Sequence, residues 1–299
     1  MRPRQFALKA SSYLWASKPA AASYPIGQPV FITDVGGFDG QSYRGSFWFS
    51  NGVSWTPVNG RMPLIHTGVP IGFANSGTVS AGAFTPTSTY GASRDTQTGV
   101  WLYFPVTAGL PSGAGWYYCT ASSGAGPFQV YTSFWNGAGY FVPNKPTSLV
   151  AASGGSAFTQ ISGSDVPAMR FSVPAGLLSA NAALHVYALC MYGPLTPGYS
   201  IFHASLGASD FGYHADNWTT GSKLLSAICQ MAGSTGRLWQ PGLGSSNMSG
   251  TLYSSASTAG INQTANENVA NAIDLTIKLS LSGATSNFEM TNLCVELAP

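Results

Sequence analysis

Regular alternation of apolar and polar residues near the end of the chain constrains the fold most strongly. The apolar residues at every second position are Ile273, Leu275, Ile277, Leu279 and Leu281, with polar residues between them. Successive side chains of a β-strand point to opposite faces, so a period of two places all five in a core and the polar residues toward water. The pattern therefore predicts a strand of a half-buried sheet.

The segment that follows carries a second alternating series with a break in it. Phe288 and Met290 form its first part, and Leu293, Val295 and Leu297 form its second part. The phase slips by one residue between Met290 and Leu293. An extra residue in one strand of a pair produces such a slip, so we expect a β-bulge or a change of sheet there.

Glycine and proline occur too often for long helices. The 299 residues include 36 Gly and 19 Pro, with 13% aromatic residues, which suits short strands joined by turns. The 44% of apolar residues can support a core, which argues against disorder. Strands are expected within 29–37, 100–106, 116–119, 128–135, 169–178 and 184–192. Residues 222–232 could form a short helix, but we favour a strand.

The segment 46–60 predicts a β-hairpin. Phe47, Trp48 and Phe49 precede Asn51-Gly52, and Trp55 follows. Asn-Gly supplies the positive φ angles of a two-residue type I′ turn.

These signals predict an all-β protein with a two-domain organisation. About eight strands after residue 146 suit an antiparallel, jelly-roll-like sandwich. The predicted parts are an N-terminal arm (1–25), a smaller β-rich domain (26–145) and the sandwich (146–299), with the boundary in the Pro- and Gly-containing stretch 144–155.

Only 7% of the residues are charged, against about a quarter in ordinary soluble domains. Catalysis draws on titratable side chains, which are scarce here, and a surface with few charges is poorly protected against association. We therefore expect much of the surface to contact other subunits. A net charge of +2 without a basic stripe argues against nucleic acid as a partner.

The sequence also argues against membrane insertion and secretion. No apolar run reaches the 18 residues of a membrane helix, and the N-terminus lacks the apolar region of a signal peptide. The cysteines Cys119, Cys190, Cys229 and Cys294 lie far apart, which predicts buried free thiols in a reducing cytoplasm, with neither a zinc site nor disulfides.

The first residues combine basic and aromatic side chains. Tyr13, Leu14 and Trp15 would be costly to leave in water, so we expect them to dock on something. The basic residues allow either a solvated arm or a tether to an acidic partner surface. On the second interpretation the anchor residues are Arg2, Arg4, Lys9 and Trp15, and deletion of residues 1–20 would abolish attachment while the sandwich stays folded.

Two segments, VPAGLLSANAALHVYALCMY (173–192) and NAIDLTIKLSLSGATSNFEMTNLCVELAP (271–299), together resemble a β-sandwich domain of tail fibres, head fibres and other virion proteins of tailed bacteriophages. ASKPAAASYPIGQPVFITDVGG (16–37), FWFSNGVSWTPVNGRMPLI (47–65) and LPSGAGWYYCTASS (110–123) resemble a second element of the same proteins. The resemblance covers most of the chain from about residue 17. Ala182-Ala183-Leu184-His185 departs from it, since a Gly and a basic residue are common there.

The resemblance implies a structural, non-enzymatic component on the outside of a virion. It implies a homo-oligomer, most plausibly a trimer, in contact with capsid or tail proteins, either as capsid decoration or head fibre or as part of a tail fibre or baseplate. The protein would be made in the host cytoplasm and would need no cofactor.

No catalytic or metal-binding motif stands out in the sequence. The densest polar segment is 210–218, where an extended chain would place His214 and Asp216 on one face for general-base work or metal ligation. We favour an exposed loop instead. His66, His185 and His203 are interpreted as hydrogen-bonded structural residues.

Recognition of a host surface glycan is the alternative function. A polysaccharide-degrading enzyme is a weaker alternative, because glycan cleavage needs two carboxylates across one bond and the sequence points to no such pair. Aromatic platforms beside polar groups in expected loops would bind the sugar. The candidates are Tyr213, His214, Asp216, Trp218 and Trp239.

Overall fold

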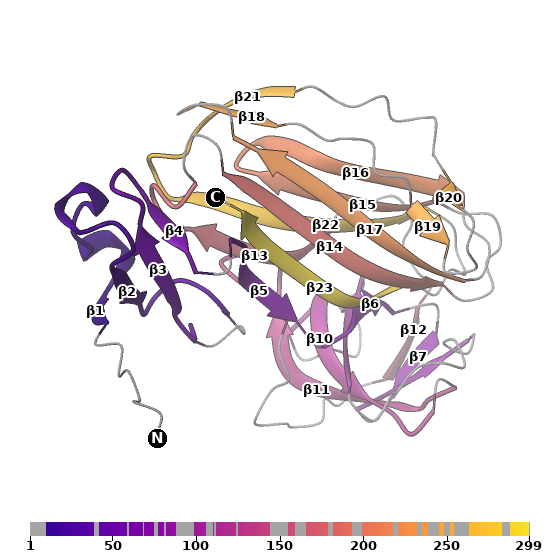
Figure 1. Cartoon of the computed structure of the whole chain (residues 1–299). Coiled ribbons are helices and arrows are strands. Elements are labelled where there is room, and N and C mark those ends of the chain that lie inside the picture. Colours follow the sequence, from indigo (N-terminus) through magenta and orange to yellow (C-terminus); the bar gives the residue numbers. More distant parts are fainter. Residues whose placement is uncertain are drawn as a thin grey trace, which may run out of the picture.

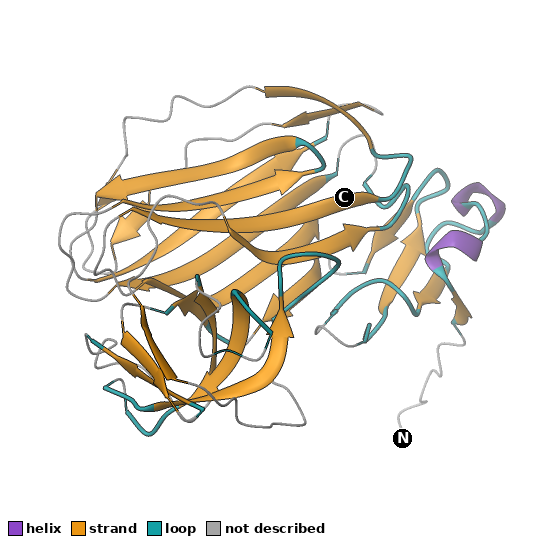
Figure 2. Ribbon diagram, turned by 180° about the vertical axis from the view of Figure 1, so that it is seen from behind, coloured by secondary structure: helices purple, strands orange, loops and turns teal. Residues whose placement is uncertain are grey.

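The computed structural model describes residues 10–38, 42–58, 60–67, 69–74, 77–80, 82–87, 99–105, 110, 112–123, 125–143, 155–158, 166–178, 182–192, 199–217, 221–231, 235–238, 245–247, 252–253, 263–282 and 288–298. Within these residues every regular element is a β-strand, apart from the 3-10 turns η1 (Trp15–Ser17) and η2 (Ala21–Ser23) (Figures 1 and 2). The prediction of an all-β protein is confirmed.

The second half of the chain forms a sandwich of two antiparallel layers. One layer is a four-stranded sheet in the order β13 (Val166–Val173), β22 (Ile273–Ser282), β15 (Tyr199–Leu206) and β16 (Ser209–Asn217). The other layer contains β23 (Phe288–Ala298), β14 (Ala183–Tyr192) and β17 (Gly221–Gln230), with β14 between its two partners. Figure 1 shows this second layer in front of the first. The sandwich prediction is confirmed, as is the strand rather than a helix over 221–230.

The core lies between these layers and explains the alternating sequence. Four of the five apolar residues of the alternating series are buried on β22, and Leu281 lies outside the part described in side-chain detail. Thr276 and Ser280, on the opposite face, are also buried, whereas we expected that face to meet water. The strand is central in its sheet, between β13 and β15, so its neighbours help to cover both faces. The facing core residues include Leu184, Val186, Phe202, Ala204, Leu275, Ile277, Val295 and Leu297.

The bulge predicted in the last strand is present. Leu189 of β14 pairs with Asn292, but the next residue, Cys190, pairs with Met290. Thr291 is therefore the extra residue. The bulge lets Met290 and Leu293 both face the core, each with 1% of its surface exposed.

The first half of the chain extends the β23 layer. The order of the large sheet is β12-β7-β8-β11-β10-β9-β6-β23-β14-β17-β19-β20, and β5 also pairs with β23. Its remaining strands are β5 (Met62–Thr67), β6 (Ile71–Phe73), β7 (Gly77–Ser80), β8 (Ala83–Pro86), β9 (Val100–Phe104), β10 (Gly115–Thr120), β11 (Phe128–Trp135), β12 (Gly155–Phe158), β19 (Ser245–Asn247) and β20 (Leu252–Tyr253). A separate two-stranded sheet pairs β18 (Thr235–Leu238) with β21 (Gln263–Asn268).

These pairings cross the predicted domain boundary. Thr67 of β5 pairs with Leu293, and Ile71 of β6 pairs with Met290, so strands from residues 26–145 complete a sheet of the sandwich. Residues 144–154 lie outside the described part of the chain. A Pro- and Gly-containing stretch indicates an irregular connection, but it carries no signal about which strands pair across it.

A small sheet forms one end of the molecule, at the left of Figure 1. β1 (Ser11–Tyr13) runs parallel to β2 (Pro29–Ile32), which is followed by β3 (Ser46–Ser50) and β4 (Trp55–Pro57) in antiparallel order. This arrangement confirms the predicted hairpin.

The turn of that hairpin differs from the prediction. Ser50 pairs with Trp55, so the loop has four residues and is not a two-residue type I′ turn. The Asn51 side chain stabilises the longer loop, since its Oδ1 accepts hydrogen bonds from the backbone N–H groups of Val53 (2.9 Å) and Ser54 (2.6 Å). Gly52 does adopt the expected positive φ, at 87°.

Candidate functional site: an apolar groove with two arginines

Trp15, an expected anchor residue, lies in the core of this chain. Its indole N–H donates a 3.0 Å hydrogen bond to the carbonyl oxygen of Ala175, at the end of the sandwich. Its ring centroid is 5.0 Å from that of Trp48, and Lys18 Nζ lies 3.6 Å from the ring centroid. Its backbone N–H donates to Asp34 Oδ1 at 2.7 Å. The expectation that this aromatic segment docks is confirmed for Trp15, and the docking surface is the protein itself.

The other expected anchor residues, Arg2, Arg4 and Lys9, lie outside the described residues. Lys18 is the basic residue of this region that the structure does describe. Burial lowers its pKa, and the nearby Asp34 carboxylate opposes that shift.

The polar segment around His214 is a strand, so the prediction of a loop is wrong. β16 lies at the edge of its sheet, and its residues His214 and Asp216 pair with Phe202 and Ser200 of β15. Alternate strand residues share a face, so the backbone places His214 and Asp216 on one face, as an extended chain requires. Tyr213 also belongs to this strand rather than to a loop. The side chains of these three residues lie outside the described part of the structure.

The remaining ligand candidates, Trp218 and Trp239, also lie outside the described residues. Within the described residues, no three His, Cys, Asp or Glu side chains gather in a way that could hold a metal ion.

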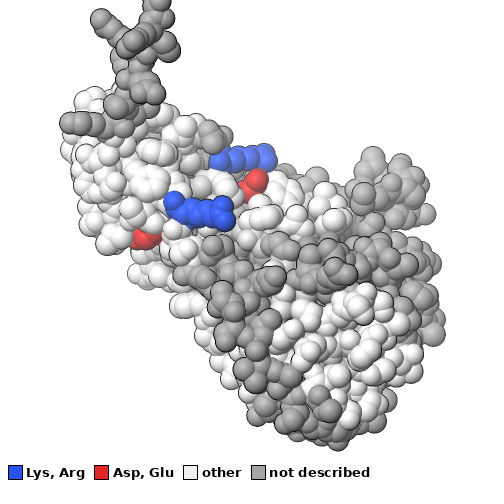
Figure 3. Space-filling view, turned by 90° about the horizontal axis from the view of Figure 1, so that it is seen from below, with Lys and Arg blue, Asp and Glu red and all other residues white. Residues whose placement is uncertain are grey.

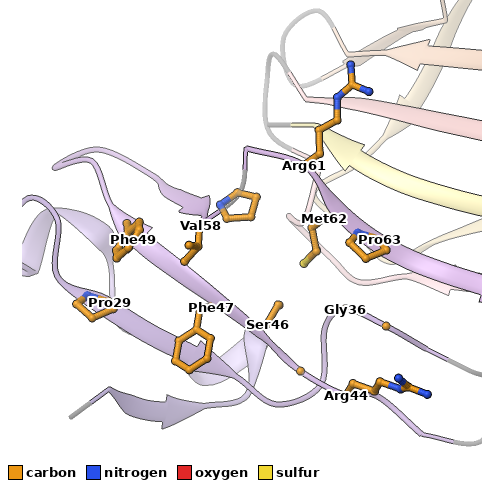
Figure 4. A pocket seen from close by; sticks show the side chains of 13 residues that line it. Pro29, Gly36, Arg44, Ser46, Phe47, Phe49, Val58, Arg61, Met62 and Pro63 are labelled. Carbon is orange, nitrogen blue, oxygen red and sulfur yellow. The ribbon is translucent and has the colours of Figure 1, made fainter. Parts of the chain in front are cut away.

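A concavity lies between the small sheet and the start of β5 (Figure 4). We call it the arginine groove. Its volume is about 520 Å³, within the usual range of ligand sites. It is lined by Pro29, Gly36, Gly37, Arg44, Gly45, Ser46, Phe47, Phe49, Pro57, Val58, Arg61, Met62 and Pro63.

Strand alternation creates the apolar wall of this groove. On β3, Trp48 is turned into the core, so its neighbours Phe47 and Phe49 face the other way. The rings of Phe47 and Phe31 lie 4.9 Å apart on this outer face. Phe47 keeps 50% of its surface exposed and Val58 keeps 43%, so the wall is apolar and open to a partner.

The polar groups of the groove are few. Ser46 Oγ donates to the Val35 carbonyl oxygen at 2.7 Å and accepts from Trp48 Nε1 at 2.8 Å, so its hydroxyl is already used. The charged groups are Arg44 and Arg61, which come from opposite ends of the lining in the view of Figure 4.

The two arginines differ in their surroundings. Arg61 Nη1 lies 3.8 Å from Glu296 Oε2 and donates a 3.4 Å hydrogen bond to the Tyr187 hydroxyl. Arg44 forms no ion pair with any carboxylate of the described residues. Its guanidinium is therefore available to an incoming anion.

A short polar network on the outer face of β14 and β23 adjoins Arg61. His185 Nδ1 lies 3.1 Å from the Tyr187 hydroxyl, which confirms a hydrogen-bonded role for His185. Burial and the positive charge of Arg61 lower the pKa of His185, against the opposing effect of Glu296. His185 is therefore neutral at pH 7.

Three of the four cysteines are described in side-chain detail. Cys119 and Cys229 are buried thiols, as expected, and Cys294 is a half-buried thiol; none of the three forms a disulfide within the described residues. Burial raises the pKa of Cys229 to about 12, and burial with the nearby Glu296 charge raises that of Cys294 to about 11. The side chain of Cys190 lies outside the described part.

The sequence analysis did not predict the arginine groove. The feature that could have indicated it is the strand 46–50, which carries apolar residues on both faces although it lies in a small sheet at one end of the molecule. Arg44 and Arg61 are 17 positions apart, and only the fold brings them to one groove.

No helix of the described residues is long and apolar enough to cross a membrane. Comparisons of the chain with models of protein families, with curated proteins and with solved structures find no match.

Proposed function

We propose that this protein is a non-enzymatic structural component of a bacteriophage virion, located on the outside of the particle and assembled as a homo-oligomer. The resemblance of residues 173–192 and 271–299 to virion sandwich domains supports the proposal. The trimer follows from that resemblance alone.

The observation that carries the proposal is the scarcity of charge on the exterior. Figure 3 shows a face on which a few basic and acidic side chains interrupt an otherwise neutral described surface. Neutral groups cost less to desolvate than charged ones, so such a surface can be buried between subunits at a small penalty. A contact that buries about 1,000 Å² of apolar area would contribute roughly 25 kcal/mol before the cost of association, which is about 4–15 kcal/mol.

Light scattering coupled to size-exclusion chromatography tests the assembly. We expect a mass near three times the 31.1 kDa of one chain. A monomer that persists at micromolar concentrations would overturn the homo-oligomer, and absence of the protein from purified particles would overturn the virion assignment.

The anchor proposal needs a shorter deletion than the sequence suggested. Removing residues 1–20 also removes β1 and Trp15, which joins the small sheet to the sandwich, so loss of attachment would be confounded with loss of packing. Removing residues 1–9 takes away Arg2, Arg4 and Lys9 but leaves β1 and Trp15 in place. We expect this variant to keep the wild-type unfolding midpoint and to fail to load onto particles, and normal loading would contradict the proposal.

A further inference from the structure

We propose that the arginine groove binds an extended peptide segment of a partner protein, in which apolar side chains alternate with carboxylates. The inference does not depend on the homo-oligomer or on the virion assignment, because a single copy of this chain contains the whole groove.

The lining favours a ligand with apolar side chains and an anionic group. Phe47, Phe49, Val58 and the three prolines supply apolar surface, and the one hydroxyl of the lining, on Ser46, is already hydrogen-bonded twice. The side-chain donors left for a ligand are the two guanidinium groups, so a sugar would find few partners for its hydroxyl groups along the apolar wall. An aromatic or aliphatic side chain needs no such partners and gains from burial of apolar area.

The course of the groove fits an extended chain. Its lining crosses β2, β3 and β4 and continues to Met62 and Pro63 at the start of β5. Neighbouring strands lie about 4.8 Å apart, so three strands span about 10 Å, and an extended peptide rises about 3.3 Å per residue. Three or four residues therefore cover the groove, with alternate side chains against its wall.

Charge complementarity supplies the second part of the recognition. Arg44 lacks an acidic partner among the described residues, and Arg61 is 58% exposed, with its Glu296 contact as long as 3.8 Å. A peptide carboxylate at either arginine would form charge-assisted hydrogen bonds.

We take the anion to come from another protein, and a second copy of this chain is one outcome of the test below. Of the ten acids in the chain, the four described in side-chain detail already have partners within it. Asp34 accepts from the Trp15 N–H, Asp274 bonds Arg170 at 3.0 Å, Glu267 accepts from the Ala208 N–H at 2.8 Å, and Glu296 meets Arg61.

Fluorescence anisotropy with the full chain tests the inference. The probe is a labelled peptide Gly-Ser-Phe-Glu-Phe-Glu-Gly-Ser, compared with one in which both Glu are Gln and one in which both Phe are Ser. We expect saturable binding of the first peptide, and at least about fivefold weaker binding of each of the others.

Variants of the groove locate the site. Arg44→Gln should weaken binding about threefold to tenfold and reduce the preference for Glu over Gln, and Phe47→Ser should weaken binding about tenfold. Leu224→Ser, on β17, removes a side chain of similar exposure (45%) outside the groove and should leave the affinity unchanged. Val58→Ser provides a second groove variant if Phe47→Ser fails to fold.

Three results would overturn the inference. The first is equal binding of the Glu and Gln peptides, and the second is binding that Leu224→Ser reduces as much as Phe47→Ser does. The third is the absence of saturable binding of the Phe-Glu peptide. If the protein then self-associates and Phe47→Ser abolishes this, the groove binds a second copy.

Discussion

Trp15 connects two parts of the molecule, the small sheet and the sandwich, through one side chain. It packs on Trp48 of the small sheet, donates to Ala175 of the sandwich and carries Lys18 over its ring. The sequence indicated that this residue would be costly to expose, because a Trp among Ala, Ser and Lys is conspicuous. The sequence did not indicate the partner, since Ala175 is 160 residues away and its carbonyl group has no sequence signature.

Trp15→Ala should lower the free energy of unfolding by about 3–5 kcal/mol, because it leaves a cavity and an unpaired carbonyl group. Trp15→Phe keeps most of the packing and should cost less, about 1–3 kcal/mol. Urea denaturation measures both variants. Leu14→Ala, at a position 54% exposed, is the control and should stay within about 0.5 kcal/mol of wild type. If Trp15→Ala lowered the free energy of unfolding by no more than Leu14→Ala does, Trp15 would not hold the small sheet and the sandwich together.

Cys229 gives the fold a pH dependence above neutrality. Its thiol has a pKa of about 12 when folded and about 9 when unfolded. Between these values the folded state retains a proton that the unfolded state loses, so stability is fully present below pH 9 and falls as the pH rises through this interval.

At pH 10 the loss of stability attributable to this thiol is about 1 kcal/mol. The buried tyrosines lower stability at high pH in the same way, so the measurement is the difference in unfolding free energy between wild type and Cys229→Ala, in urea at pH 7.5 and at pH 10. That difference should shift by about 1 kcal/mol in favour of the variant. If the difference in unfolding free energy were the same at both pH values, the Cys229 thiol would have the same pKa in the folded and unfolded states.

The β-bulge at Thr291 shows what an apolar pattern can establish about an element. The slip between Met290 and Leu293 predicted the extra residue, because strand alternation has a strict period and one irregular residue is visible against it. The four-residue loop at Asn51 was not predicted, because the Asn-Gly pair suits several turns and the Asn51 side chain decided between them. The strand β16 was taken for a loop because its sequence is polar, and edge strands need no apolar alternation.

Deletion of Thr291 should destabilise the protein severely. Without the bulge the register slips by one residue, and either Met290 or Leu293 must turn from the core toward the outer face. We expect a loss of at least about 2–5 kcal/mol, or a failure to fold, in thermal unfolding of the purified protein. Thr291→Ala keeps the residue count and should be far milder. Equal stability of the deletion and wild type would show that the bulge is dispensable.

For the molecule as a whole, the fold class was predictable from the sequence, and the pairing of distant strands was not. Strand patterns are local, so the sandwich could be read from residues 166–298. The pairing of β5 and β6 with β23 joins residues more than 200 positions apart, and no local pattern encodes such a contact. The arginine groove was hidden for the same reason.

The fragments 1–145 and 146–299 test whether the halves are independent. Each lacks strands that the other supplies to the large sheet, so we expect neither to show cooperative unfolding alone. Co-expression of the two should restore a soluble complex. Cooperative thermal unfolding of fragment 1–145 by circular dichroism would instead identify it as an autonomous domain.

The position of β23 has a consequence for how complete copies are selected. During translation this strand emerges after β5, β6 and β14, all of which pair with it. A polypeptide that stops short of residue 288 leaves three strands with open hydrogen-bonding edges at once. Prematurely terminated products would therefore fail to fold and would be lost to aggregation or proteolysis. Folding would in this way remove truncated chains before they can associate with other subunits.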